Sequence, residues 1–169
     1  KNNIIFTKAY ASMLKRSQIT LNIILNEMDL KLKPIINQAL NERDYGDLIG
    51  QNKEDAAKKF GEEQVQIWRR SYDIPPPGGE SLKMTCERTL PYFDKILNNS
   101  NDNDKIIIAA HGNSIRAIVM KIFNYTPELI LKTEIGWCEP WIFEFDGNKL
   151  INLEIKSRPD SKSMSKLPD

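Results

Sequence analysis

The stretch Lys105–Phe123, KIIIAAHGNSIRAIVMKIF, joins a short apolar run to a helix-like segment through a single histidine, the only one among 169 residues. The run IIIAA is typical of a strand covered on both faces of a parallel sheet. The segment NSIRAIVMKIF is apolar nearly all round, which indicates a buried helix. His111 ends the strand, and Gly112 permits a tight turn. Asn113 or Ser114 then caps the helix. We therefore expect a central strand that brings an imidazole to a helix N-terminus.

Strand-like and helix-like segments alternate along the rest of the chain, which predicts an α/β layer fold with a mostly parallel sheet. Helical spacing of apolar residues, or capping residues at the ends, indicates helices at residues 13–28, 52–61, 62–73 and 81–97. In the second of these, Asn52 is the expected N-cap and Gly61 the expected end. Further strands are expected at residues 4–12 and 33–40, and a hairpin at 140–155 turns at Asp146-Gly147. Residues 1–155 then form one domain, and the Lys-, Ser- and Pro-rich residues 156–169 form a flexible tail.

Composition limits the classes of function. The 24 Lys and Arg residues nearly balance 23 Asp and Glu residues, which argues against nucleic-acid binding driven by bulk charge. No apolar run approaches the ~20 residues of a membrane-spanning helix, so we expect no membrane association. Cys86 and Cys138 match no metal or redox spacing, and a lone histidine makes a zinc site improbable. We expect a metal-free cytoplasmic protein in which any anion site is local.

Charged side chains suggest where such an anion site lies. If Ser12 caps the first helix, Arg16 falls in the first turn, where the helix dipole disfavours a cation by about 0.3–1 kcal/mol. A cation at this end suggests a nearby anion. Arg69 and Arg70 can form a fork for carboxylate or phosphate oxygens, although a helix C-terminus alone explains them. Glu42 is either an acid or base, or a solvated loop residue. The residues alone thus indicate an arginine-rich anion site around a histidine that could equally satisfy a backbone carbonyl.

Several segments together resemble a known family. LNERDYG, NKEDAAKKFGEEQVQIWRRSYDIPPP, ESLKMTCERTLPYF, AAHGNSIRAIVMK and YASMLKRSQITL are similar to the cofactor-dependent phosphoglycerate mutases of the histidine phosphatase superfamily. The similarity covers most of residues 9–121. It implies a three-layer sandwich with helices on both faces of the sheet. It also implies interconversion of 3-phosphoglycerate and 2-phosphoglycerate through a phosphohistidine, with 2,3-bisphosphoglycerate as phosphorylating primer and no metal.

The resemblance assigns roles to residues at matching positions. Glu42 would be the general acid or base at the sugar-acid hydroxyl, and Arg16 and His111 would hold the transferring phosphoryl group. The substrate's carboxylate or distal phosphate would be bound by Tyr45, Lys53, Arg69, Arg70, Gly112 and Asn113. Small-molecule phosphoglycerates are the expected partners, and a homo-oligomer is compatible with the sequence.

Two departures from the family pattern qualify this expectation. The family's nucleophile lies in an R-H-G motif after a first strand, and the 169 residues contain no such motif. We therefore expect the intact protein to carry that strand and nucleophile loop before Lys1, and the 169-residue chain alone to be inactive. In EIGWCEPW, Cys138 and Glu139 replace a glycine-containing turn, and a side chain at positive φ would reshape that side of the pocket. A phosphatase on the same scaffold and a noncatalytic relative that binds anions or a protein partner are the alternatives.

Overall fold

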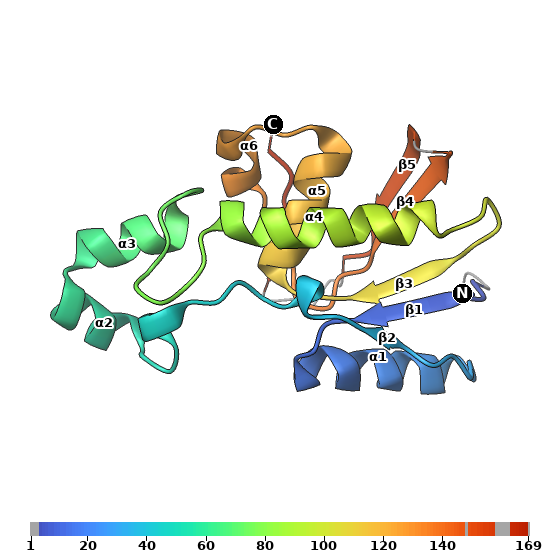
Figure 1. The fold of residues 1–169 in the computed structure, drawn as a ribbon, viewed down its shortest axis with the longest axis horizontal. Helices are drawn as coiled ribbons and strands as arrows, with labels where there is room; N and C mark the ends of the chain where they lie inside the picture. Colours follow the sequence, from blue (N-terminus) through green and yellow to red (C-terminus); the bar gives the residue numbers. More distant parts are fainter. Residues whose placement is uncertain (1–3, 148, 158–162, 169) are drawn as a thin grey trace.

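A parallel sheet lies between helices on its two faces (Figure 1). The computed structural model describes residues 4–147, 149–157 and 163–168, with the side chain of Lys53 outside the description. Strand β1 (Lys8–Ala11) pairs in parallel with β2 (Ile35–Ile36) on one side and β3 (Ile106–Ala109) on the other. This arrangement confirms the α/β class with a parallel sheet and flanking helices.

The other elements follow the expected alternation. They are α1 (Lys15–Glu27), α2 (Lys53–Phe60), α3 (Glu62–Arg70), α4 (Leu82–Asn98), α5 (Gly112–Phe123), α6 (Pro127–Lys132), β4 (Trp141–Asp146) and β5 (Lys149–Ile155). Two short 3-10 turns cover Gln38–Leu40 and Gly46–Leu48. The hairpin of β4 and β5 forms a second, antiparallel sheet, and Gly147 has φ +55° in its turn.

The sheet is covered by apolar contacts on both sides because side chains of β1 alternate between its faces. Ala9 and Ala11 pack with Leu21 and Leu25 of α1. Tyr10 belongs to a separate buried cluster with Leu40 and Ile96, the latter on α4. A third cluster joins α4, α5 and α6, so the helices on that side form a continuous layer.

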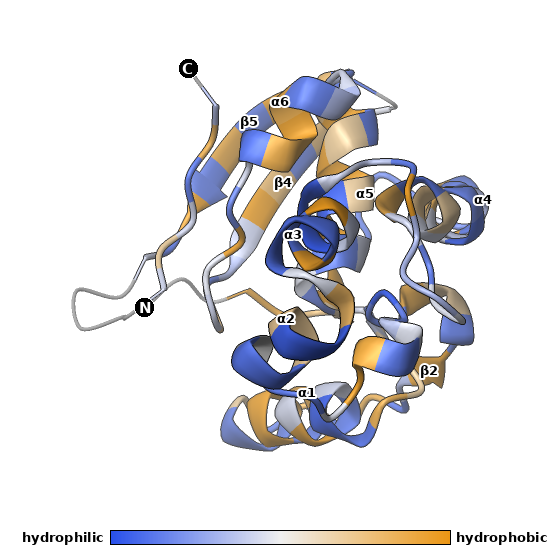
Figure 2. Cartoon of the chain, turned by 90° about the vertical axis from the view of Figure 1, so that its left-hand side faces the viewer, coloured by the Kyte–Doolittle hydropathy of each residue, from blue (hydrophilic) through white to orange (hydrophobic). Residues whose placement is uncertain are grey.

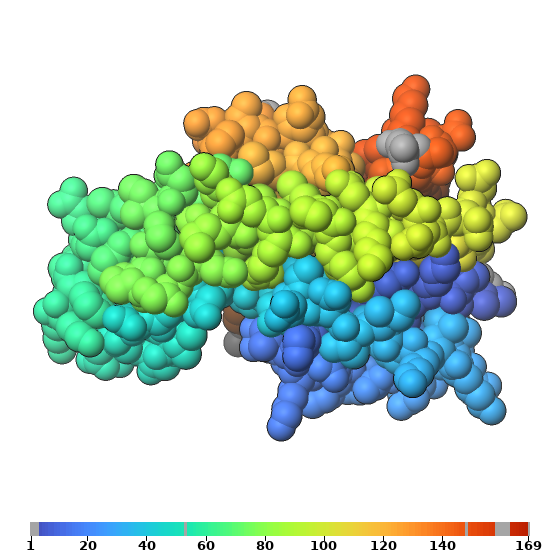
Figure 3. Space-filling view, in the orientation of Figure 1, coloured from blue at the N-terminus to red at the C-terminus, as the bar shows by residue number. Residues whose placement is uncertain are grey.

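Helices α2 and α3 form a lobe beside this sandwich (Figure 3). Buried Leu48, Ala56 and Val65 hold the lobe together. Asn52 accepts a hydrogen bond from the Asp55 N–H and caps α2, and Gly61 ends that helix at φ +84°, as the sequence predicts. Figure 2 shows mostly hydrophilic residues along α2 and α3. No helix within the described residues is long and apolar enough to span a membrane.

Three local expectations are wrong. The N-cap position of α5 is His111, and not Asn113 or Ser114, because the helix already begins at Gly112. The expected strand at 33–40 is limited to Ile35–Ile36, since Asn37 accepts the Ala39 N–H and turns the chain into a 3-10 helix. Ser12 does not cap α1; the N-cap position is Leu14, and the Ser12 hydroxyl accepts the Leu14 N–H from outside the helix.

The C-terminal segment lies against the connection between α6 and β4. Glu134 and Lys166 form an antiparallel bridge in which each N–H donates to the other residue's carbonyl, at 2.8 and 2.9 Å. The Ser165 hydroxyl accepts hydrogen bonds from the Gly136 N–H and the Trp141 indole. The expected flexible tail at 156–169 stays a prediction, and residues 158–162 and 169 lie outside the described residues.

Candidate active site

A carboxylate lies at the N-terminus of α5. One oxygen of Glu42, Oε1, accepts hydrogen bonds from the Asn113 N–H at 3.2 Å, the Asn113 side-chain amide at 2.9 Å and the Arg43 N–H at 2.7 Å. The same amide donates to the Tyr45 hydroxyl at 3.2 Å. Gly112 adjoins the other carboxylate oxygen, and a Cβ there would make only an ordinary contact with it, at 3.7 Å. The helix terminus therefore binds an anion, and within the chain that anion is Glu42.

The imidazole of His111 precedes the same helix. It is 8% exposed, and its Nε2 shares a 2.7 Å hydrogen bond with the fully buried hydroxyl of Ser12. Burial lowers the pKa of His111 below its ordinary value, and the nearby positive charge of Arg16 lowers it further. The Glu42 carboxylate acts in the opposite direction. The structure thus brings an imidazole and a carboxylate to one helix N-terminus, with the first-turn cation of α1 close enough to influence the imidazole's charge.

The loop that carries Glu42 is held by Arg88 of α4. Its guanidinium makes a bidentate pair with Glu80, at 2.8 and 2.7 Å. The same group donates to the carbonyls of Ala39 at 2.9 Å, Asn41 at 3.1 Å and Glu42 at 3.2 Å. One side chain therefore satisfies several carbonyls of an irregular loop that no strand or helix could satisfy. Sequence analysis missed this role, although Arg88 lies within ESLKMTCERTLPYF.

A close backbone contact fixes the far end of this loop. Gly46 has φ +51°, and a Cβ there would overlap the carbonyl oxygen of Pro77. The Asp47 N–H donates to that carbonyl at 3.0 Å, and the Glu80 N–H donates to the Asp44 carbonyl at 2.7 Å. The loop bearing Glu42 and the proline-rich turn before α4 are therefore joined backbone to backbone.

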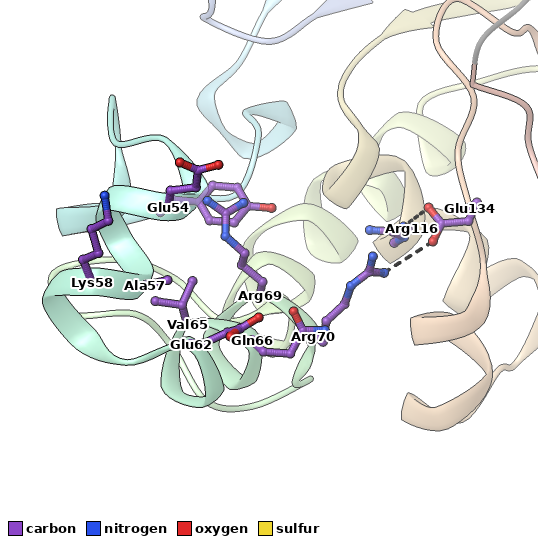
Figure 4. Close-up of a pocket in the computed structure, with 11 residues that line it drawn as sticks. Glu54, Ala57, Lys58, Glu62, Val65, Gln66, Arg69, Arg70, Arg116 and Glu134 are labelled. Carbon is purple, nitrogen blue, oxygen red and sulfur yellow. Dashed lines mark hydrogen bonds and ion pairs between the residues drawn. The ribbon is translucent and has the colours of Figure 1, made fainter.

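A cavity of about 650 Å³ opens between the α2–α3 lobe and α5 (Figure 4). Its lining includes the predicted site residues Tyr45, Arg69 and Arg70. The Tyr45 ring is contacted by two guanidiniums, with Arg43 at 4.4 Å and Arg69 at 5.8 Å from the ring centroid. Arg43 is 3% exposed and forms no ion pair among the described residues, so it adds a buried positive charge beside Tyr45.

Arg116 connects this cavity to the Glu42 cluster, and sequence analysis did not select it. It lines the cavity, and its guanidinium donates to the Asn113 side-chain oxygen at 3.4 Å and to the Thr133 carbonyl at 2.8 Å. Its position four residues after Gly112, one turn along α5, places it on the same side of the helix as the site, a periodicity that could have identified it.

The predicted residues thus form two connected groups. Glu42, Tyr45, Gly112 and Asn113 make up the cluster at the helix terminus, with His111 preceding it and Arg16 near the imidazole. Arg69 and Arg70 line the cavity that Tyr45 shares with that cluster. Lys53 begins α2, but its side chain lies outside the described residues. The catalytic and binding roles of these residues stay predictions.

The chemistry available here is that of anion binding. The cavity presents Lys58, Arg69, Arg70 and Arg116 against Glu54, Glu62 and Glu134. Within the described residues, His, Cys, Asp and Glu form no cluster of three or more that could hold a metal ion. Cationic groups gathered near a helix terminus beside a histidine and a carboxylate are what transfer or hydrolysis of a phosphoryl group requires. These features define an α/β protein of the phosphoryl-handling class.

The family follows from comparison with known proteins. Residues 2–156 match the model of the histidine phosphatase superfamily (branch 1), and the chain belongs to that family. A 2,3-bisphosphoglycerate-dependent phosphoglycerate mutase of Parvibaculum lavamentivorans is 54% identical over 147 residues, which cover 85% of this chain and 69% of that protein. The mutase of the same name from Rhodopseudomonas palustris is 51% identical over 154 residues, or 90% and 74% of the two chains.

Solved structures support the fold. The α-ribazole phosphatase of Shigella flexneri superposes with a TM-score of 0.78 at 16% identity, over 91% of this chain and 75% of that chain. A mycobacterial glucosyl-3-phosphoglycerate phosphatase gives a TM-score of 0.71 at 17% identity, over 89% and 76%. Identities this low establish a shared architecture and carry no statement about substrate.

Proposed function

We propose that this protein interconverts 3-phosphoglycerate and 2-phosphoglycerate, the mutase step of glycolysis and gluconeogenesis. The observation that carries the proposal is the Glu42–Asn113–Tyr45 cluster, which borders an arginine-lined cavity. The buried imidazole of His111 lies just before the helix that carries Asn113. Relatives about half identical to the chain carry the mutase name, and they support the same conclusion. The substrates carry a carboxylate and a phosphate, for which the cavity offers guanidiniums.

Each residue of the site then has its own role in the proposed reaction. Arg69 and Arg70 bind the carboxylate or the distal phosphate, Asn113 orients the Glu42 carboxylate, and that carboxylate exchanges a proton with the substrate hydroxyl. His111 and Arg16 hold the phosphoryl oxygens and stabilise their charge. Depression of the His111 pKa keeps much of the imidazole neutral near pH 7, so it can act as a hydrogen-bond partner that gains a proton when an anion arrives.

The names of the relatives also imply dependence on 2,3-bisphosphoglycerate, which supplies a phosphoryl group to the enzyme when it is bound. The residues present fit such a ligand, because Arg69, Arg70 and Arg116 gather around one cavity large enough for a small bisphosphate. We propose that these three arginines hold it. No metal is needed in this scheme, because the guanidiniums supply the positive charge.

Partners and location are part of the proposal. Phosphoglycerates are the proposed partners, and a cytoplasmic location fits that substrate class and the two free thiols of Cys86 and Cys138. A homo-oligomer is supported by exposed isoleucines at positions 19, 23 and 35 on α1 and β2.

The test is a coupled assay of the intact protein with 3-phosphoglycerate, with and without 2,3-bisphosphoglycerate. We expect primer-dependent formation of 2-phosphoglycerate with little free phosphate. Glu42→Gln should lower kcat by about 10²–10⁴-fold, the range for general acid–base groups. The control Glu63→Gln, at an exposed position outside the cavity lining, should keep normal turnover. Primer-independent phosphate release without isomerisation would instead identify a phosphatase. Binding of phosphoglycerates with neither reaction would identify a noncatalytic relative.

A further inference from the structure

Glu134 lies between two arginines at the edge of the cavity. One carboxylate oxygen is 2.9 Å from a terminal nitrogen of Arg116, and the other is 3.5 Å from a terminal nitrogen of Arg70 (Figure 4). The carboxylate therefore bridges α5 to the end of α3. It belongs to EIGWCEPW, the segment that departs from the family pattern, and nothing in the proposed mechanism uses it.

The two contacts of Glu134 are unequal. The Arg116 side chain is 19% exposed, and its guanidinium is also held by the Thr133 carbonyl at 2.8 Å and by Asn113 at 3.4 Å. The Arg70 side chain is 63% exposed, and its contact with Glu134 is long. An exposed ion pair of this kind is weak, so Arg70 can exchange partners at little cost while Arg116 cannot.

The backbone holds Glu134 in this place. Its N–H and carbonyl both pair with Lys166, and two residues further on the Gly136 N–H donates to Ser165 at 2.8 Å. In the same turn Cys138 adopts φ +53°, which confirms that a side chain occupies a left-handed position here. Because the turn is fixed on both sides, the Glu134 carboxylate stays at the cavity edge when Arg70 moves.

We propose that Glu134 is a specificity-determining residue that competes, as an internal anion, with the ligand for Arg70. An incoming carboxylate or phosphate pairs with Arg70 in place of Glu134. Glu134 stays paired with Arg116. Glu134 then faces the bound ligand as a like charge, so its repulsion grows with the ligand's negative charge. It thereby weakens binding of multiply charged phosphate esters more than binding of monoanionic acids. This inference rests on the proposed function for the identity of the natural ligand, but it applies to any anion in the cavity.

The test compares Glu134→Gln with Glu62→Gln, which removes a carboxylate from the same cavity lining where no ion pair is described. Calorimetry on the intact protein, at constant ionic strength, measures Kd for inorganic phosphate and for D-glycerate. Glu134→Gln should bind phosphate about two- to fivefold more tightly, the range set by an exposed ion pair. Its gain for D-glycerate should be smaller, and Glu62→Gln should give a clearly smaller gain for phosphate, because its carboxylate forms no described ion pair with Arg70.

A second variant assigns the gain to Arg70. When Arg70 is already replaced by Gln, the additional change Glu134→Gln should tighten phosphate binding much less, because Glu134 no longer has an arginine at position 70 to compete for. Weaker or unchanged phosphate binding in Glu134→Gln, an equal gain in Glu62→Gln, or no phosphate binding by any of these proteins would each overturn the proposal. Binding is measured without turnover, so absence of mutase activity refutes the proposed function and leaves this comparison intact.

Discussion

Replacing Arg88 by Met should destabilise the fold and displace Glu42 together. The Arg88 and Glu80 side chains are 24% and 22% exposed, so their bidentate pair is mostly shielded from water. Breaking a buried pair by removing one partner costs about 3–5 kcal/mol, because the remaining charge is left unpaired. The partial exposure reduces that figure, and we expect about 2–4 kcal/mol of unfolding free energy to be lost.

Urea unfolding at neutral pH measures this loss, and thermal unfolding should show a fall in Tm of about 5–15 °C for a protein of this size. The matched control is Lys121→Met, which breaks the Lys121–Asp94 pair, whose side chains are 39% and 43% exposed. That change should cost less than about 1 kcal/mol. Arg88→Lys keeps the charge but loses the planar fork, so it should fall between the wild type and Arg88→Met.

Activity provides the second measurement. In Arg88→Met the carbonyls of Asn41 and Glu42 lose their donor, so kcat should fall even at temperatures where the variant remains folded. A variant that loses no more stability than Lys121→Met, or that keeps full kcat, would refute the argument that this guanidinium organises the loop.

Three further predictions concern the core, the thiols and the histidine. Leu21→Ala, at a fully buried position, should cost about 2–5 kcal/mol of unfolding free energy. Ile19→Ala, at a position 56% exposed on the same helix, should cost far less. Equal losses in urea unfolding would contradict the packing of α1 on the sheet. Exposed Cys138 should react rapidly with a thiol reagent at pH 8, while Cys86, whose pKa burial raises to about 11, should react only on unfolding; the rates of the two single serine variants separate them. Because burial and Arg16 lower the pKa of His111 in the folded state, its contribution to stability is intact above the unfolded value of 6.5 and is lost as pH falls through the folded pKa. Unfolding free energy should therefore decline more steeply from about pH 7.5 to pH 5.5 in the wild type than in His111→Gln, and parallel profiles would show that the imidazole titrates normally.

The sequence predicted those elements whose signals are local. The α2 cap at Asn52, the Gly61 terminus and the Asp146-Gly147 hairpin all depend on residues a few positions apart, and all are present. Ser12 satisfied the same local rule for α1, yet its hydroxyl bonds His111, which is 99 residues away. A pairing at that distance leaves no local signal, so capping preference gave the wrong helix start.

The candidate site likewise contains residues that the sequence indicated and residues that it did not. Glu42, Tyr45, Asn113 and the Arg69-Arg70 pair, which the resemblance selected, lie around one region, and their roles stay predictions. The resemblance did not reveal Arg88, whose partners in the Glu42 loop are backbone carbonyls that carry no residue identity. Likewise, the apolar run before His111 indicates burial and does not say which strands lie beside it.

The contact of Gly46 with Pro77 has a practical consequence for protein engineering. The turn at residues 75–79 is mostly exposed and has the composition of a tolerant insertion point, so it would attract peptide grafts or loop exchange between homologues. Its backbone, however, abuts the segment that presents the Glu42 carboxylate. A graft there would displace the Glu42 carboxylate more than it would lower Tm. Chimaeras should therefore exchange residues 75–79 and the Glu42 loop together.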